Sequence, residues 1–140
     1  MIREIEVELD GFGDMADITE ELRKFVDEYV ERMGIDEGAV LVFNIGSTGA
    51  VTTIEYEPGL KKDLPRIMEK IAPYGEDYEH HRTWGDDNGS GHVRASIIGP
   101  SLLVPFVNGR LILGRWQQVV IINFDTRRRK RRVLLQILRA

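Results

Sequence analysis

Residues 96–125 read SIIGPSLLVPFVNGRLILGRWQQVVIINFD, and this apolar stretch is the strongest structural signal in the chain. Its β-branched and aromatic residues favour strands. The pair Asn108-Gly109 inside it is a strong signal for a two-residue β-hairpin turn, so we expect one strand on either side. The strands expected in this half of the chain are 101–107, 110–114, 116–125 and 131–138.

The N-terminal third predicts a strand followed by a helix. Residues 2–9 alternate apolar and charged side chains, as in a half-buried strand. After two glycines, Asp17 is a suitable helix N-cap, with Glu20 three positions later as its reciprocal partner. Apolar residues then recur at helical spacing until Gly34, which predicts a surface helix packed on a sheet.

The middle of the chain predicts two more strands and a second helix. Residues 39–46 are apolar and β-branched, and residues 47–57 continue with period two. Residues 60–73 have the pattern of a helix with Pro65 near its start. Residues 74–92 are predicted to form a long loop, and long loops in compact domains are usually functional or disordered.

These elements together predict the α+β class. We expect one domain spanning residues 1–140, with two helices packed on a mostly antiparallel sheet or sandwich. The composition, 42% hydrophobic and 30% charged, is that of a globular protein and argues against wholesale disorder.

The chain has no cysteine, which excludes disulfides, thiolate catalysis and cysteine-ligated zinc. No apolar run approaches the roughly 20 residues of a membrane helix, so we expect no membrane contact. The N-terminus carries alternating charges, unlike a signal peptide. A cytoplasmic location is therefore expected.

Six consecutive cations occupy residues 127–132. The formal net charge is −4, so the remainder of the chain carries −10. Such a basic run can bind phosphate or nucleic acid. We favour a solvated hairpin tip between two strands instead, because the acidic remainder would repel a polyanion.

The clearest functional signal is a cluster of imidazoles. All three histidines lie in one glycine- and acid-rich segment with several polar neighbours: His80, His81 and His92 with Glu79, Asp86, Asp87 and Asn88. Imidazole is a common metal ligand and titrates near pH 7. We expect His80 and His92 to converge, either on a divalent metal (zinc, magnesium or manganese) or for proton transfer. The alternatives are a surface position for His81 and an ordinary element start for His92.

Further candidates lie elsewhere in the chain. Glu55 is a candidate general base or metal ligand, and an exposed strand glutamate is the alternative. Ser47 and Thr48 are candidate donors to a phosphate or carboxylate. Asp63 is by default a solvated or capping residue. Trp116 is expected in the core rather than at a ligand.

One run, which starts at His92 and ends at Gln117, has the pattern H-x-R-A-S-I-I-G-P-S-L-x-V-P-x-x-x-G-R-L-x-L-G-x-W-Q. It is followed by F-D and a basic turn. Three further features support the same resemblance: T-x-x-E at residues 52–55, the helix with Asp63, and Y-E-H at residues 78–80. With these motifs the chain resembles the YjbQ family, whose members are often labelled secondary thiamine-phosphate synthase enzymes. The resemblance covers the chain from about residue 38, and the N-terminal third more loosely.

The resemblance implies a compact α+β subunit that assembles as a trimer. It also implies a histidine-lined pocket between subunits that can hold a divalent metal, and a weak thiamine-phosphate-forming activity. The pocket residues implied by the matching positions are His80, His92 and Glu55, with Asp63 and Ser96 near them.

The chain departs from the family pattern at two positions. Gly46 stands where the family usually has the histidine of an H-T-T/S-A motif, and Arg115 replaces the threonine of G-T-W-Q. Losing one imidazole weakens a metal site, because three protein ligands and an open position define the common catalytic arrangement. His81 is expected either to replace this imidazole or to point outward.

Two functional hypotheses follow. An enzyme-like site would join a pyrimidine pyrophosphate to a thiazole phosphate, with a metal on His80 and His92, and Glu55 as base or ligand. Arg94 or Arg115 would attract the small phosphate-bearing substrate. The alternative is a non-catalytic trimeric module that binds a small anion or metal. Nucleic-acid binding is the least favoured function.

Overall fold

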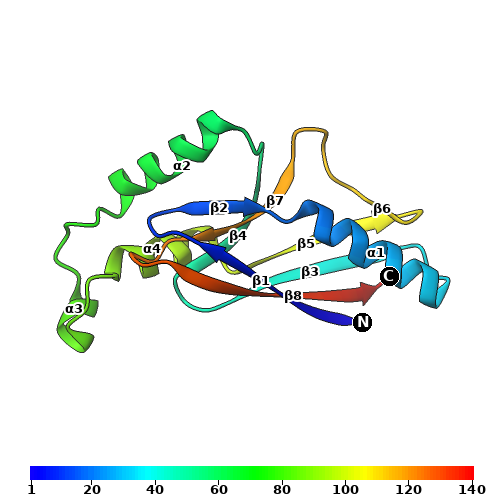
Figure 1. Ribbon diagram of the computed structural model, residues 1–140, viewed down its shortest axis with the longest axis horizontal. Coiled ribbons are helices and arrows are strands. Elements are labelled where there is room, and N and C mark those ends of the chain that lie inside the picture. The colour runs from blue at the N-terminus through cyan, green and yellow to red at the C-terminus, as the bar shows by residue number, and fades with distance from the viewer.

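Two antiparallel β-sheets form the centre of the molecule in the computed structural model, which describes residues 1–140 (Figure 1). The strand order is β1-β8-β3-β5-β6 in the five-stranded sheet and β2-β7-β4 in the three-stranded sheet. The strands are β1 (Ile2–Leu9), β2 (Asp14–Asp17), β3 (Gly38–Ile45), β4 (Gly49–Ile54), β5 (Ser101–Val107), β6 (Arg110–Leu111), β7 (Gln118–Asn123) and β8 (Arg129–Arg139). The helices are α1 (Thr19–Met33), α2 (Pro58–Ile71), α3 (Glu79–Trp84) and α4 (Gly89–Ile98). The predicted α+β class is confirmed, and none of the helices has the length and apolarity needed to cross a membrane.

The central strand β7 is buried on both faces. Val119 and Ile121 belong to a core of 16 buried residues that α1 and strands of both sheets share. Val120 and Ile122 belong to a second core of seven residues, to which α2 and α4 contribute. Successive strand side chains point to opposite faces. The unbroken apolar run of β7 is therefore what a strand covered on both sides requires.

Helix α1 forms as the apolar periodicity predicts, with its buried side chains facing the larger core. The observed N-cap is Ile18, one residue after the predicted cap. The Asp17 carboxylate nevertheless accepts a hydrogen bond from the Thr19 amide at 2.9 Å. Gly34 ends the helix in the left-handed conformation, and its amide bonds back to Val30. The predicted end of the helix is confirmed.

The β-hairpin is confirmed, whereas several strand boundaries were misplaced. Asn108 and Gly109 both have positive φ, 54° and 74°, as a two-residue hairpin turn requires. β6 is only two residues long, and the strand expected over 47–57 ends at Ile54. Strand β2 was not predicted, because a four-residue strand is too short to show a period and forms only through its pairing with β7.

The prediction of a long loop over residues 74–92 is wrong, because this segment contains α3 and the start of α4. The molecule thus has four helices where two were expected. The Gly-Ser-Gly start of α4 has low intrinsic helix propensity, but it packs directly on a neighbouring backbone. A Cβ at Gly91 would lie 2.4 Å from the Phe124 carbonyl oxygen. Tertiary packing therefore overrides local preference here.

The cationic run is not a solvated hairpin tip, since β7 and β8 lie in different sheets and residues 124–128 cross between them. Three of the six cations form ion pairs with the acidic strand β1 or with Asp10 after it. Ion pairs join Arg132 to Glu4 at 2.8 Å and Lys130 to Glu6 at 3.7 Å. Arg131 points the other way, into the protein, because side chains alternate along a strand.

The outer face of the five-stranded sheet is uncovered, and it is largely apolar over β3, β5 and the end of β8, whereas ion pairs occupy the part over β1. Its register places Leu41 opposite Leu103, and Phe43 opposite Leu134. Phe43 and Leu103 are both exposed, with relative accessibilities of 39% and 56%. The helices of this chain leave that face open.

The close packing of α4 on the end of β7 gives the first prediction. Gly91→Ala should destabilise the fold by about 1–3 kcal/mol, because its methyl group would overlap the Phe124 carbonyl. Urea denaturation measures the change in the free energy of unfolding. Gly75→Ala, which meets nothing within 4 Å, is the matched control. Equal stability of the two variants would contradict this account of the packing.

Candidate functional site

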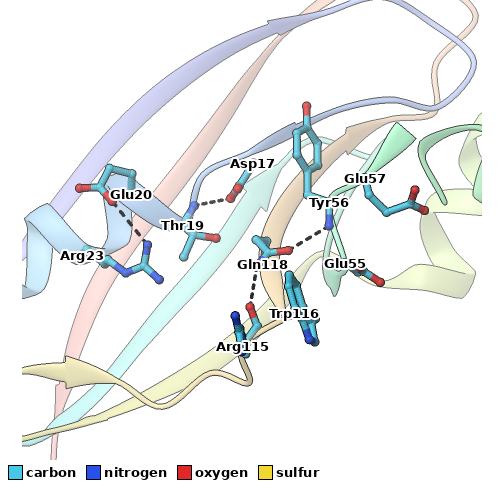
Figure 2. Close-up of a pocket in the computed structure, with 10 residues that line it drawn as sticks. All are labelled: Asp17, Thr19, Glu20, Arg23, Glu55, Tyr56, Glu57, Arg115, Trp116 and Gln118. Carbon is cyan, nitrogen blue, oxygen red and sulfur yellow. Dashed lines mark hydrogen bonds and ion pairs between the residues drawn. The ribbon is translucent and has the colours of Figure 1, made fainter. Parts of the chain in front are cut away.

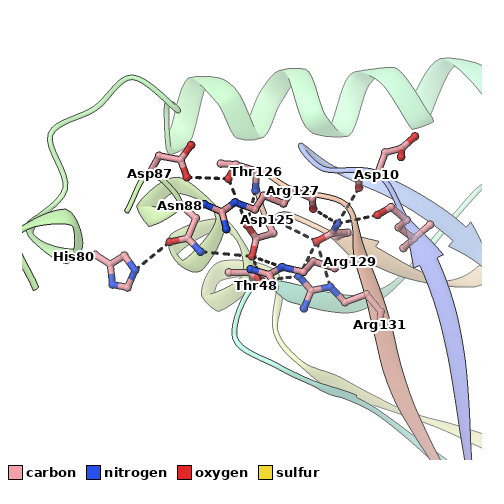
Figure 3. Close-up of polar contacts among 12 residues, drawn as sticks. Asp10, Thr48, His80, Asp87, Asn88, Asp125, Thr126, Arg127, Arg129 and Arg131 are labelled. Atoms are coloured by element: carbon pink, nitrogen blue, oxygen red, sulfur yellow. Dashed lines mark hydrogen bonds and ion pairs between the residues drawn. The ribbon is translucent and has the colours of Figure 1, made fainter. Parts of the chain in front are cut away.

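A pocket of about 430 Å³ lies where three segments meet, and none of its nine lining residues is hydrophobic. The segments are the turn between β3 and β4, the start of α4, and the crossover from β7 into β8. The lining residues are Gly46, Ser47, Thr48, Asn88, His92, Asp125, Arg129, Lys130 and Arg131. We call this site the polar pocket, and Figure 3 shows most of its contacts.

The buried carboxylate of Asp125 is the hub of these contacts (Figure 3). Its Oδ2 accepts hydrogen bonds from Thr48 Oγ1 at 3.0 Å and from Arg129 Nε at 3.1 Å. Its Oδ1 accepts one from the Thr126 amide at 2.7 Å. Burial, the largest single effect, raises the pKa of Asp125, but the hydrogen bonds and the charge of Arg129 outweigh it. The net pKa lies below the usual value, so the group stays ionised.

Arg131 supplies a buried cation to the same network. Its Nε and Nη2 donate to Asn123 Oδ1 at 3.2 and 2.6 Å, and Nη2 also donates to Thr48 Oγ1 at 2.5 Å. The Thr48 hydroxyl hydrogen is in turn directed at Asp125. Burial lowers the pKa of Arg131, although a guanidinium stays charged at all physiological pH values.

His80 and His92 lie side by side at the rim of the polar pocket, with ring centroids 4.3 Å apart. His80 Nε2 lies 3.3 Å from Asp86 Oδ1. The Asn88 amide lies 3.1 Å from the same nitrogen, whichever of its two ends faces the ring. Burial and then the neighbouring His80 lower the pKa of His92, while Asp125 opposes them. A neutral imidazole at this rim can accept or donate a proton.

His81 takes neither of the two positions expected for it. Its Nε2 accepts a hydrogen bond from the Gly89 amide at 3.0 Å, and its ring packs edge-on against Tyr78 with centroids 5.5 Å apart. It therefore holds the start of α4 in place. The Nε2 lone pair of His81, which a metal ion would need, already accepts the hydrogen bond from the Gly89 amide.

Glu55 and Arg115 lie in a different pocket of about 470 Å³, shown in Figure 2. Its lining residues are Asp17, Thr19, Glu20, Arg23, Glu55, Tyr56, Glu57, Arg115, Trp116 and Gln118. Strand β4 runs from one pocket to the other, so roughly 17–20 Å separates them within one chain. Trp116 is 63% exposed and lies under the Arg115 guanidinium, so the expectation that it belongs to the core is wrong.

Three other predicted residues have partners outside the polar pocket. Arg94 is buried, where its Nε donates to the Ala72 carbonyl at 3.0 Å and its guanidinium pairs with Glu69. This pairing ties α4 to the end of α2. Ser96 Oγ donates to the His92 carbonyl within α4. Asp63 is exposed on α2 and pairs with a neighbouring arginine at 3.5 Å.

Sequence reasoning missed Asp125 and Arg131 as site residues. A signal for Arg131 was present, because it precedes Val133, Leu135 and Ile137 in strict period two. That alternation puts the arginine on the buried face of β8. Asp125 lies two residues after the end of β7, whose centre, residues 119–122, is apolar and buried.

Comparison with known proteins identifies the family of this chain. A family model described as "UPF0047 protein YjbQ-like" matches residues 3–140. The chain belongs to this family. It is 36% identical over 125 residues to a UPF0047 protein of Archaeoglobus fulgidus, covering 89% of this chain and 91% of that protein. It is 32% identical over 126 residues to the UPF0047 protein YugU of Bacillus subtilis, covering 89% and 90%.

Solved structures of YjbQ-like proteins share the fold. A hypothetical protein from Aeropyrum pernix K1 superposes with a TM-score of 0.89 at 27% identity, over 100% of this chain and 99% of that one. A YbjQ-like protein of unknown function from Sulfolobus solfataricus P2 gives a TM-score of 0.84 at 25% identity, over 100% and 99%. The family resemblance seen in the sequence is therefore confirmed along nearly the whole chain.

The environment of His92 gives the second prediction. Its pKa in the folded chain should lie below 6.5, and His80→Gln should raise it by removing the neighbouring imidazole. The unfolded chain binds this proton more tightly than the folded chain. The His92 contribution to stability is therefore present above pH 6.5 and decreases as the pH falls through the lower folded value. NMR titration of the imidazole nitrogens measures both values, and a His92 pKa at or above 6.5 would refute the prediction.

Proposed function

We propose that this chain binds a small phosphate-bearing molecule in the polar pocket. The observation that carries the proposal is the charge of the lining, whose three cations, Arg129, Lys130 and Arg131, share one lining carboxylate, Asp125. Lys130 also pairs with Glu6, which lies outside the lining, at 3.7 Å. With His92 neutral, the lining carries a net charge of +2. A purely polar, cationic cavity favours a compact anion over an apolar or cationic ligand.

The donors of the pocket suit phosphate chemistry. Arginine presents planar pairs of N–H groups that match phosphate oxygens, and its hydrogen bonds to a charged group are short and strong. The hydroxyl of Ser47 is exposed at the mouth of the same cavity. Thr48 contributes indirectly, because its hydroxyl positions Asp125 and Arg131. His92 would be the group that moves a proton at the bound ligand.

A divalent metal is the second candidate ligand, and the residues present fit it in part. His80 and His92 with Asp86 would supply two imidazoles and a carboxylate, a donor set that suits zinc better than magnesium or manganese. His80 lies close to both His92 and Asp86, but the structure contains no group of three histidine or carboxylate side chains arranged to hold a metal ion. Bound there, the cation would neutralise negative charge on a phosphate-bearing substrate. Gly46 and the engaged His81 leave the trio without a third imidazole.

Thiamine-phosphate formation stays a prediction. The reaction expels pyrophosphate, and the cations of the polar pocket would stabilise such a leaving group. Glu55 and Asp63, which the resemblance placed in the same pocket, lie elsewhere within one chain. A chain that binds the anion without turnover, the non-catalytic alternative, fits this separation. The expected cytoplasmic location also stays a prediction.

Phosphate affinity gives the third prediction. Arg129→Gln should weaken binding of inorganic phosphate by roughly tenfold or more, because a charge-assisted hydrogen bond contributes about 1.5–3 kcal/mol. Isothermal titration calorimetry measures the dissociation constant. Arg66→Gln, which removes an exposed arginine on α2, is the matched control. Equal affinity of the two variants would contradict the proposed site.

Assembly gives the fourth prediction. The uncovered apolar face of the five-stranded sheet supports the expected homo-oligomer, most simply a trimer, since large exposed apolar patches on soluble proteins usually mark interfaces. Light scattering in dilute solution should report a mass several times that of one 16.0 kDa chain. A mass equal to that of one chain would reject it.

A further inference from the structure

The backbone at Gly46 faces the buried guanidinium of Arg131 with no side chain between them. A Cβ built at this position would lie 3.0 Å from Arg131 Nη1 and 3.9 Å from Asn44 Nδ2, with no other atom within 4 Å. Gly46 has a φ of 135°, a conformation that residues with a side chain rarely adopt. Asn44 Nδ2 donates to the Gly46 carbonyl at 3.1 Å and holds this geometry. The backbone therefore leaves an opening beside the guanidinium.

One nitrogen of that guanidinium has no protein partner. Nε and Nη2 are engaged by Asn123 and Thr48, whereas Nη1 donates to no atom of the chain. Arg131 as a whole is only 5% exposed, and it lines the polar pocket. Nη1 is not one of the buried side-chain atoms that lack a partner, so it is open to the pocket. A ligand oxygen in the space beside Gly46 would give this charged donor an acceptor.

The charges around Arg131 are also incompletely balanced. Asp125 is the only carboxylate lining the pocket, and it bonds directly to Arg129 rather than to Arg131. Burial depresses the pKa of Arg131, and the charge of Arg129 adds to this effect, while the charge of Asp125 opposes it. Because Lys130 also pairs with Glu6, one positive charge of the lining has no carboxylate partner. A terminal phosphate can present three free oxygens to the space beside Gly46, whereas a phosphodiester carries a second bulky substituent.

We propose that the space beside Gly46 is the subsite for a terminal phosphate group whose oxygens accept hydrogen bonds from Arg131 Nη1. The ligand of the polar pocket is then a phosphate monoester, and Gly46 determines this specificity. The inference rests on the proposed function and narrows its ligand class.

The variant that tests the subsite is Gly46→Ala, with inorganic phosphate as the probe. Its methyl group would fill the space at Nη1, so affinity should fall by roughly tenfold or more, the effect of one lost charge-assisted hydrogen bond. Gly34→Ala is the matched control, because Gly34 also has a positive φ but meets nothing within 4 Å. Circular dichroism verifies that both variants are folded. Phosphate affinity in folded Gly46→Ala equal to that of the control would overturn the inference.

A second measurement uses the unaltered chain and does not depend on the variant folding. In NMR spectra of arginine side chains, inorganic phosphate should shift the Arg131 signal, and dimethyl phosphate should bind roughly tenfold or more weakly. Two results would overturn the subsite while leaving the proposed function intact. In the first, phosphate shifts the NMR signal of Arg129 but not that of Arg131. In the second, dimethyl phosphate binds as tightly as inorganic phosphate. Absence of phosphate binding, or binding insensitive to Arg129→Gln, would instead overturn the proposed function and the subsite with it.

Discussion

The buried guanidinium of Arg131 connects the two sheets. It projects from β8 of the five-stranded sheet, and its hydrogen bonds go to Asn123 at the end of β7 and to Thr48 just before β4, both of the three-stranded sheet. A buried cation must be satisfied by well-placed acceptors, and removing one partner of such a group is strongly destabilising. The positions of the crossover and of the turn before β4 both follow from this requirement.

The same constraint creates the polar pocket. Asn123, which also donates to the carbonyls of Leu9 and Arg127, is fully engaged by the fold. Thr48 is engaged by Asp125 and Arg131, so only the outer edge of the guanidinium network remains available to a ligand. Stability and binding thus depend on the same charged groups. A bound anion would stabilise the fold as well as occupy the site.

The three-stranded sheet has pockets of opposite charge at its two ends. The polar pocket, at the start of β4, has a lining with net charge +2 when its histidine is neutral. The pocket at the other end, with Glu55 and Trp116, is lined by four carboxylates and two arginines. Because β4 and β7 are rigid and run between them, a small ligand in one pocket does not reach the other within one chain. Within one chain, the residues that the family resemblance assigned to one pocket between subunits therefore lie at two separate sites.

Local patterns in the sequence were enough to predict the α+β class, α1 and the hairpin turn at Asn108-Gly109, because periodicity and turn chemistry involve neighbouring residues. They also brought attention to His80 and His92, which are close in the chain and in space. Only the tertiary structure decided which other residues join them. The burial of Arg131, the partner of Arg94 and the helical state of α4 depend on contacts between segments far apart in the chain, and no local pattern records those contacts.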